Sequence, residues 1–139
     1  MVKKKSKFFL LVVLFVLVDQ ISKYFVISKF FYLSSINVNA SFSLPLKNIA
    51  MIYISVVLLI FFVFVYAFYI KRYFKAEFET TMILSGAFSN LLDRFARHGV
   101  IDFINLKIWP SFNLADILIT TGSILLIYKI LFALKQKEN

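Results

Sequence analysis

Two aspartates, Asp102 and Asp116, stand in apolar surroundings, and two such carboxyl groups held side by side can catalyse hydrolysis. Both lie in the stretch VIDFINLKIWPSFNLADILI, residues 100–119. A carboxylate that reaches neither water nor a partner is costly in such surroundings. Two close carboxyl groups do not both ionise readily, so the ionised one can activate a water molecule while the other supplies a proton. That is the chemistry of an aspartic protease.

The other five of the seven acids have simpler explanations. Two precede a basic residue by four positions, which is the spacing of an ion pair along one helix: Asp19 with Lys23, and Asp93 with Arg97. Three lie in segments expected on the cytoplasmic side: Glu77, Glu79 and Glu138. Asp102 and Asp116 have no basic residue at helical spacing. The residues alone still leave open a non-catalytic polar site, such as the ion or drug pocket of a small transporter.

The composition places this pair in a membrane protein. The chain has 139 residues, 61% of them hydrophobic, and a mean hydropathy of +0.86, whereas globular proteins average about 45–50% apolar residues. It has no cysteine and one histidine, His98, so a disulfide framework, a thiolate metal site and a multi-histidine site are excluded within one chain. We expect no metal or cofactor. The net charge of +9 is attributed to membrane topology rather than to nucleic-acid binding.

Four stretches approach the roughly 20 residues that a helix needs to cross a bilayer. They are approximately 8–27, 49–70, 80–97 and 112–134. The third is the weakest because it carries Asn90, Asp93 and Arg94. The sequence predicts one all-α integral membrane domain over residues 1–139, with four transmembrane helices and small extracytoplasmic β or loop elements between helices 1 and 2 and between helices 3 and 4.

Basic residues set the expected orientation. The N-terminal MVKKKSK, the loop KRYFK and the tail LKQKEN are rich in lysine and arginine, and such segments stay in the cytoplasm. Both termini are therefore expected there, while residues 28–48 and 98–111 face outward. Trp109, near a helix end, is most simply an interfacial aromatic residue.

Polar residues within the predicted helices form stripes that meet at one depth. One stripe in the third helix has offsets of 0, 4, 7, 8 and 11 and contains Gly86, Asn90, Asp93, Arg94 and Arg97. Another, at the start of the fourth helix, contains Asn113, Asp116 and Thr120. The ion pairs and asparagines in these stripes also have a purely structural explanation, as contacts that hold the helices together.

Five ordered motifs make the chain resemble the lipoprotein signal peptidase family, also called signal peptidase II. Members of this family are four-helix intramembrane aspartic proteases of bacteria. DQISK at 19–23 is similar to the family's D-Q-x-x-K, and NVNASF at 37–42 to its N-x-G-x-A-F. SGAFSNLLDR at 85–94 is similar to G-G-A-x-G-N-x-x-D-R, while VIDF and FNLAD match V-x-D-F and F-N-x-A-D. Their order on a four-helix frame makes the resemblance specific.

The resemblance implies a function and a role for eight of the motif residues. Asp102 and Asp116 become the catalytic dyad, which needs no cofactor. The residues implied to line or support the site are Asn37, Asn90, Arg94, Asn113, Asp19 and Lys23. The implied substrate is a prelipoprotein whose signal peptide precedes a diacylglyceryl-modified cysteine, and the implied cut lies just before that cysteine. The implied setting is the bacterial inner membrane, with the site toward the extracytoplasmic side and a monomeric enzyme in contact with membrane lipid.

The chain departs from the family pattern at three glycines, where it has Asn39, Ser85 and Ser89. These changes bear on loop geometry and substrate range more than on the reaction. Two alternatives remain: a small four-helix transporter or binding protein that uses Asp19 as its coupling acid, and a catalytically inactive relative kept as a scaffold.

Overall fold

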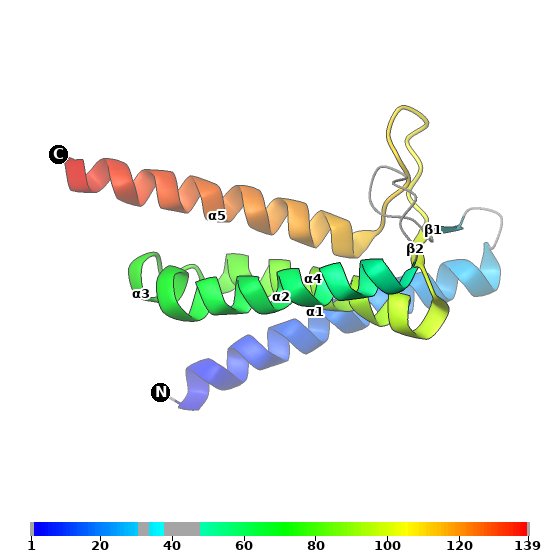
Figure 1. The fold of residues 1–139 in the computed structure, drawn as a ribbon, viewed down its shortest axis with the longest axis horizontal. Coiled ribbons are helices and arrows are strands. Elements are labelled where there is room, and N and C mark those ends of the chain that lie inside the picture. Colours follow the sequence, from blue (N-terminus) through cyan, green and yellow to red (C-terminus); the bar gives the residue numbers. More distant parts are fainter. Residues whose placement is uncertain (1, 31–33, 38–47, 139) are drawn as a thin grey trace.

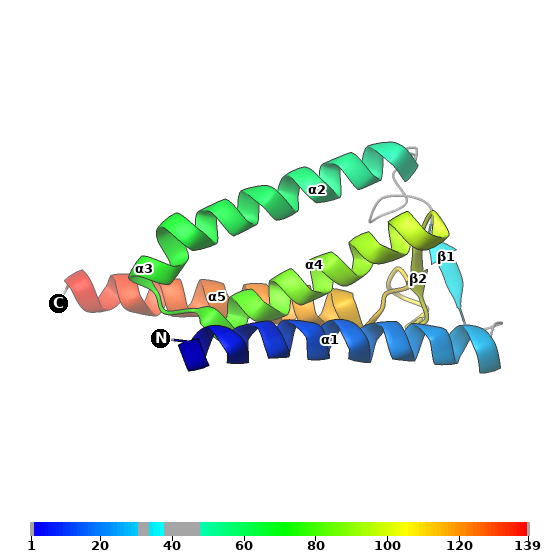
Figure 2. The same ribbon diagram turned by 90° about the horizontal axis from the view of Figure 1, so that it is seen from below.

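Four long helices make up most of the computed structural model, which describes residues 2–30, 34–37 and 48–138. They are α1 (Val2–Lys29), α2 (Asn48–Val65), α4 (Glu77–Arg97) and α5 (Leu114–Glu138). A π-helical turn, η3 (Tyr66–Ile70), and the short α3 (Lys71–Tyr73) continue α2. Both ends of the chain lie at one end of the bundle, and two short strands lie at the other (Figures 1 and 2). The expectation of a helical protein with small β elements is confirmed.

The central helix, α4, packs against α1, α2 and α5. Three helical segments of the described chain are long and apolar enough to cross a membrane, Lys7–Lys29, Ile49–Tyr73 and Leu114–Gln136, and α4 is not among them. Its polar residues are covered by neighbouring helices, so they do not face lipid: Ser85, Ser89, Asn90 and Asp93 are buried. The prediction of four membrane spans therefore stays a prediction, although the fourth long helix is present.

A glycine brings α4 and α5 into close contact. A Cβ atom on Gly86 would lie 2.3 Å from the backbone oxygen of Ala115 and 2.8 Å from Cγ1 of Ile119. No side chain fits in that space, so the first turn of α5 rests directly on the backbone of α4. Since Ala115 precedes Asp116, this contact fixes one of the two candidate acids against α4.

Strands β1 (Ser35–Asn37) and β2 (Val100–Asp102) pair in antiparallel register, with Ser35 opposite Asp102. The chain then forms a hairpin, closed by an antiparallel bridge between Ile104 and Phe112. The start of α5 was expected at 112 but lies at Leu114. The reason is that Asn113 caps the helix from outside it, as its contacts below show.

Candidate active site

Asp116 is held in the first turn of α5 by a reciprocal cap. The Asn113 Oδ1 atom accepts a hydrogen bond from the Asp116 backbone N–H at 3.0 Å, and Asp116 Oδ2 accepts one from the Asn113 N–H at 3.2 Å. This is the geometry of a capping box, which satisfies two backbone donors at a helix start. The capping residues thus fix the position of the carboxyl group as well as the start of the helix.

Asp102 ends strand β2 and is 3% exposed. Its Oδ1 accepts a hydrogen bond from Asn113 Nδ2 at 2.8 Å, and its Oδ2 accepts one from Asn37 Nδ2 at 3.1 Å. Burial raises the pKa of Asp102 to about 6; the Asn37 hydrogen bond opposes this rise, and the nearby charge of Asp116 adds to it. Asp102 therefore keeps a proton at pH values where an exposed aspartate has lost it.

The two carboxyl groups share one cavity. A space of about 320 Å³ is lined by Asn37, Asp102, Trp109, Asp116 and Thr120, together with residues 110–112 and Ile119. Asn113 also joins the two acids, because its side chain contacts the Asp102 carboxyl group and the Asp116 backbone. A water molecule in this cavity has access to both carboxyl groups.

Asn90, in the middle of α4, connects Asp116 to the buried interior. Its Nδ2 donates to Asp116 Oδ1 at 2.8 Å. Its Oδ1 accepts from Asn113 Nδ2 at 3.2 Å and from Lys23 Nζ at 3.1 Å. Because both donors point at Oδ1, the amide can only turn its NH₂ group toward Asp116.

Lys23 lies at the centre of a fully buried ionic cluster behind the dyad. Its Nζ is 2.6 Å from Asp19 Oδ2 and 2.8 Å from Asp93 Oδ2, and all three side chains are 0% exposed. Asp19 also accepts hydrogen bonds from the Ser89 hydroxyl at 2.6 Å and from the Ala115 N–H at 2.9 Å. Asp19 therefore ties α1 to α4 and to the start of α5. Asp93 was assigned to pairing with Arg97 alone; it contacts Arg97 and Lys23 together.

Gln20 belongs to this cluster, although the sequence analysis gave it no role. It donates to the Ser89 hydroxyl at 2.9 Å and to Asp93 at 3.0 Å, and it accepts from Arg97 at 3.1 Å. The available signal was its position three residues before Lys23, a spacing that puts two side chains on neighbouring parts of one helix face.

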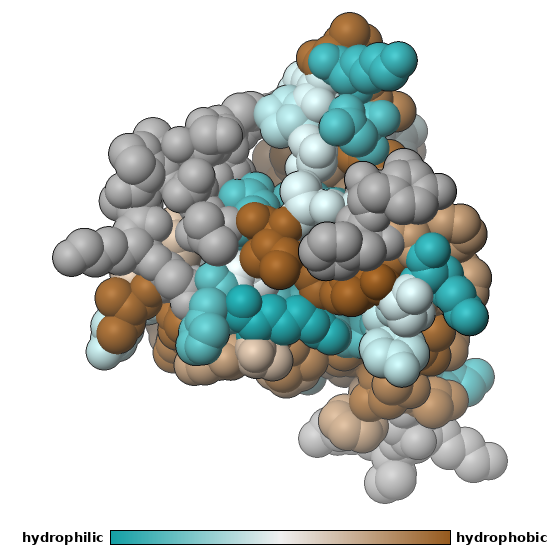
Figure 3. Space-filling view, turned by 90° about the vertical axis from the view of Figure 1, so that its right-hand side faces the viewer, coloured by the Kyte–Doolittle hydropathy of each residue, from teal (hydrophilic) through white to brown (hydrophobic). Residues whose placement is uncertain are grey.

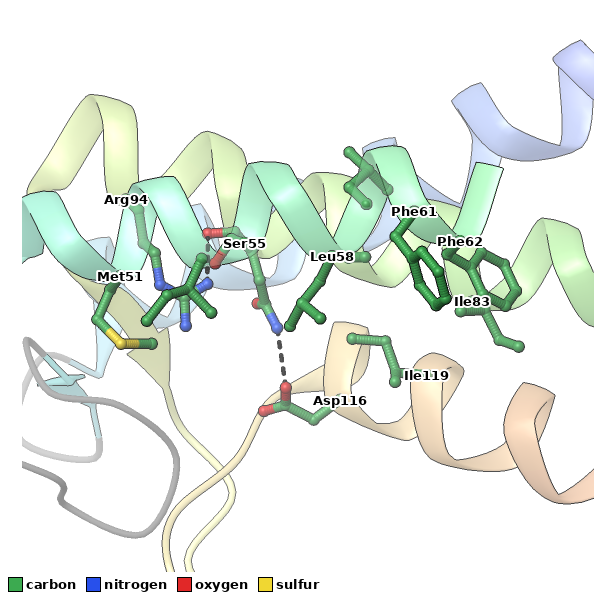
Figure 4. A pocket seen from close by; sticks show the side chains of 13 residues that line it. Met51, Ser55, Leu58, Phe61, Phe62, Ile83, Arg94, Asp116 and Ile119 are labelled. Carbon is green, nitrogen blue, oxygen red and sulfur yellow. Dashed lines mark hydrogen bonds between the residues drawn. The ribbon is translucent and has the colours of Figure 1, made fainter. Parts of the chain in front are cut away.

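A second, more apolar cavity lies between α2 and the α4–α5 pair. It measures about 440 Å³, and its walls include Met51, Leu58 and Phe62. Figure 4 shows Arg94 and Asp116 reaching it from α4 and α5. Asp116 lines this cavity as well as the one that it shares with Asp102, so an apolar groove leads to the acid pair.

Hydrogen bonds and ion pairs between side chains join seven of the eight predicted site residues into one network. They are Asp102, Asp116, Asn37, Asn90, Asn113, Asp19 and Lys23. The eighth, Arg94, donates to the Asn90 backbone oxygen at 3.3 Å and lines the apolar groove. Ser85 and Ser89, which replace family glycines, are buried in α4. Asn39 and the rest of its motif after Asn37 lie outside the described residues.

Fold and site define a helical membrane protein with a carboxyl pair at one end of its bundle. A family model described as "Signal peptidase (SPase) II" matches residues 11–132. The chain belongs to the signal peptidase II family.

Individual relatives agree with this assignment. The lipoprotein signal peptidase of Moorella thermoacetica is 34% identical over 142 residues, covering 89% of this chain and 92% of the relative. That of Syntrophomonas wolfei is 35% identical over 139 residues, covering 91% and 93%. Two solved structures, each described as a bacterial membrane enzyme, share the fold at 24% identity. Their TM-scores are 0.79 and 0.77, and the aligned regions cover 95% and 91% of this chain and 92% and 93% of theirs.

Proposed function

We propose that Asp102 and Asp116 are the catalytic dyad with which this signal peptidase removes signal peptides from prelipoproteins. The observation that carries the proposal is that both carboxyl groups line one cavity while Asn113 contacts both residues. This arrangement suits acid and base catalysis on one water molecule.

In the proposed reaction Asp116 is the base and Asp102 the acid. In this proposal Asp116 takes the ionised form, and each of its carboxyl oxygens accepts a hydrogen bond, from Asn90 Nδ2 and from the Asn113 N–H. It takes a proton from water as the hydroxyl oxygen bonds to the scissile carbonyl carbon. Asp102, protonated because it is buried, gives its proton to the leaving nitrogen as the C–N bond breaks. The products are a carboxyl group on the signal peptide and a free amine on the mature lipoprotein.

The proposed substrate carries a diacylglyceryl-modified cysteine, and the cut falls just before it. The apolar groove between α2 and the α4–α5 pair has walls that suit an apolar signal peptide or acyl chains, and it ends at Asp116. The asparagine amides of Asn37, Asn90 and Asn113 are directed at the two acids. Arg94 in the groove is therefore the residue that we assign to the substrate's backbone carbonyls.

The proposed setting is the bacterial inner membrane, with both termini in the cytoplasm and the dyad toward the extracytoplasmic side. The lysine-rich ends of the chain and the dyad lie at opposite ends of the bundle (Figure 1). One copy of the chain supplies every residue of the network, which suits a monomeric enzyme.

The deciding experiment compares wild type with Asp102→Asn and Asp116→Asn on a diacylglyceryl prelipoprotein, after reconstitution in lipid. Each substitution is expected to lower kcat/KM by about 10²–10⁴-fold or more, because each removes one partner in proton transfer. Glu77→Gln, at the opposite end of α4, is the control and keeps the wild-type rate. The assignment is wrong if wild type fails to cleave or if either asparagine variant cleaves normally. A transporter that uses Asp19 would keep its function in Asp102→Asn.

A further inference from the structure

We propose that the tip of the hairpin between β2 and α5, Leu106 to Trp109, is a lipid anchor that enters the membrane interface beside α5. The inference concerns a surface and does not depend on the proposed catalytic residues. Its partner is the phospholipid of the surrounding bilayer at the end of the bundle where Asp102 and Asp116 lie.

The tip exposes large apolar side chains, and one of them, Trp109, also lines the cavity that Asp102 and Asp116 share. Ile108 is 93% exposed, Trp109 60% and Leu106 56%. Three such side chains within four residues, at the point of a loop, are unusual on a surface that faces only water. The cation between them, Lys107, is also exposed. Tryptophan, lysine and aliphatic residues together are the composition of a segment at the headgroup level of a bilayer.

The turn at the tip satisfies part of its own backbone. Lys107 has a φ of 64°, and its backbone N–H donates to Asn105 Oδ1 at 2.8 Å. The Ile108 N–H donates to the Leu106 oxygen at 2.8 Å. These two internal hydrogen bonds lower the cost of placing the turn in a less polar environment.

The direction of the hairpin matches the plane of a membrane surface. In Figure 1 the helices run horizontally and the hairpin projects upward from their end, across the direction of the helices and on the side of α5. If the helix axes cross the bilayer, the hairpin lies along its surface. Figure 3, which views this end of the bundle, shows hydrophobic and hydrophilic atoms side by side on the projecting tip.

The space beneath the hairpin continues the lipid-facing surface of α5. A groove of about 370 Å³ lies between Leu106, Trp109 and Phe112 on one side and Asp116, Ile117, Thr120 and Thr121 on the other. The α5 helix is one of the segments long and apolar enough to span a membrane, and Ile117 is 40% exposed. Lipid that covers this face of α5 is thus in reach of the tip. Insertion of the tip would hold the start of α5, and Asp116 with it, at a constant depth.

Trp109 is the single tryptophan of the chain, so its fluorescence reports on the tip alone. The test uses the full chain in vesicles of phosphatidylcholine and phosphatidylglycerol whose acyl chains carry bromine either close to the headgroup or close to the chain end. We expect strong quenching by the shallow bromines, weaker quenching by the deep ones, and protection from acrylamide in the water. Quenching by acrylamide with no effect of brominated lipid overturns the proposal, and so does stronger quenching by the deep bromines.

A double variant separates anchoring by the tip from contact of Trp109 with lipid on its own. Leu106→Ser with Ile108→Ser removes two exposed side chains and should lose most of the shallow quenching. Ile36→Ser on β1, at the same end of the bundle and 54% exposed, is the matched control and should keep it. Far-ultraviolet circular dichroism verifies that all variants retain their helices. Unchanged quenching in the folded double variant also overturns the proposal.

Discussion

Asp102 and Asp116 differ in what surrounds them, and this difference supports the proposed assignment of acid and base. Asp102 lies at the end of a buried strand and has two amide donors. Asp116 is partly buried in the first turn of a helix, where it accepts one backbone and one side-chain hydrogen bond and where the helix dipole favours a negative charge. We therefore propose Asp102 as the acid and Asp116 as the base.

The raised pKa of Asp102 gives the proposed reaction a pH dependence. Because that pKa is about 6, the acid form is lost as pH rises above 6, and kcat/KM should fall on the alkaline side with an apparent pKa near 6. Asn37→Ala removes a donor that stabilises the ionised carboxylate, so the pKa should rise and the alkaline limb should move to higher pH. Ser35→Ala is the control, since in the described part of the chain the Ser35 hydroxyl donates to the Asp102 backbone oxygen and not to its carboxyl group. If the alkaline limb of the kcat/KM profile does not move in Asn37→Ala, the assignment of Asp102 as the acid is contradicted.

The charge of Lys23 should be needed for a stable fold, so that an uncharged side chain of similar size cannot replace it. Lys23→Met leaves Asp19 and Asp93 buried without their shared cation, which is expected to cost about 3–5 kcal/mol of unfolding free energy. Lys129→Met makes the same change in the Lys129–Glu79 pair, where the lysine is 40% exposed, and should cost about 1 kcal/mol or less. Denaturation of each variant in detergent micelles measures the unfolding free energy.

A third variant identifies the cause of that loss. In Lys23→Met, Asp93 keeps its ion pair with Arg97, whereas Asp19 loses its cation. Adding Asp19→Asn to Lys23→Met removes this unpaired charge and should recover part of the unfolding free energy. Equal effects of the two methionine variants would show that the buried cluster is not held by charge.

At the level of whole elements, the sequence predicted helix positions better than it predicted which helices face lipid. The α1, α2 and α5 helices are apolar on nearly all sides, so hydropathy identifies them as possible spans. The polar stripe of α4 was visible from its spacing, but hydropathy cannot tell a stripe that faces three other helices from one that faces water. The sequence also could not predict that β1 pairs with β2, because strands of three residues carry little sequence pattern of their own.

The α1–α4 interface should depend on one hydroxyl group that replaces a family glycine. The Ser89 Oγ donates to Asp19 at 2.6 Å and accepts from Gln20 at 2.9 Å. Ser89→Ala removes both bonds from a buried site and should lower the unfolding free energy by about 1–3 kcal/mol. Ser85→Ala is an equal change in the same helix, but among the described residues that hydroxyl bonds only to the backbone oxygen of Thr81 in α4 itself. The thermal unfolding midpoint should therefore fall more in Ser89→Ala, and a larger loss in Ser85→Ala would contradict a role of Ser89 in joining the helices.

At the level of the whole molecule, the site depends on contacts between parts of the chain that are far apart. Asp19 and Ala115 are 96 positions apart, and Asn37 and Asp102 are 65 apart. Helical spacing shows which residues share a face but not which faces meet. The meeting of the stripes at one depth could be predicted from the helix lengths. The exact partners could not, because they depend on the rotation of each helix and on the close contact at Gly86.

The arrangement of the ends predicts a definite membrane topology, and the absence of cysteine makes it testable. Single cysteines replace Lys75, Asn105 and Lys135, which are exposed in the structure; Asn105 lies in the hairpin but outside its tip. In spheroplasts, a membrane-impermeant maleimide should label Asn105→Cys directly and the other two only after permeabilisation, since the hairpin lies at the opposite end of the bundle from α3 and the C-terminus (Figure 1). The wild-type chain, without cysteine, is the blank. Opposite labelling of positions 75 and 105 requires α4 to cross the bilayer, because α4 is the helix that joins them. Labelling of both positions from the same side would mean that α4 does not cross the membrane, and the four-span prediction would be wrong.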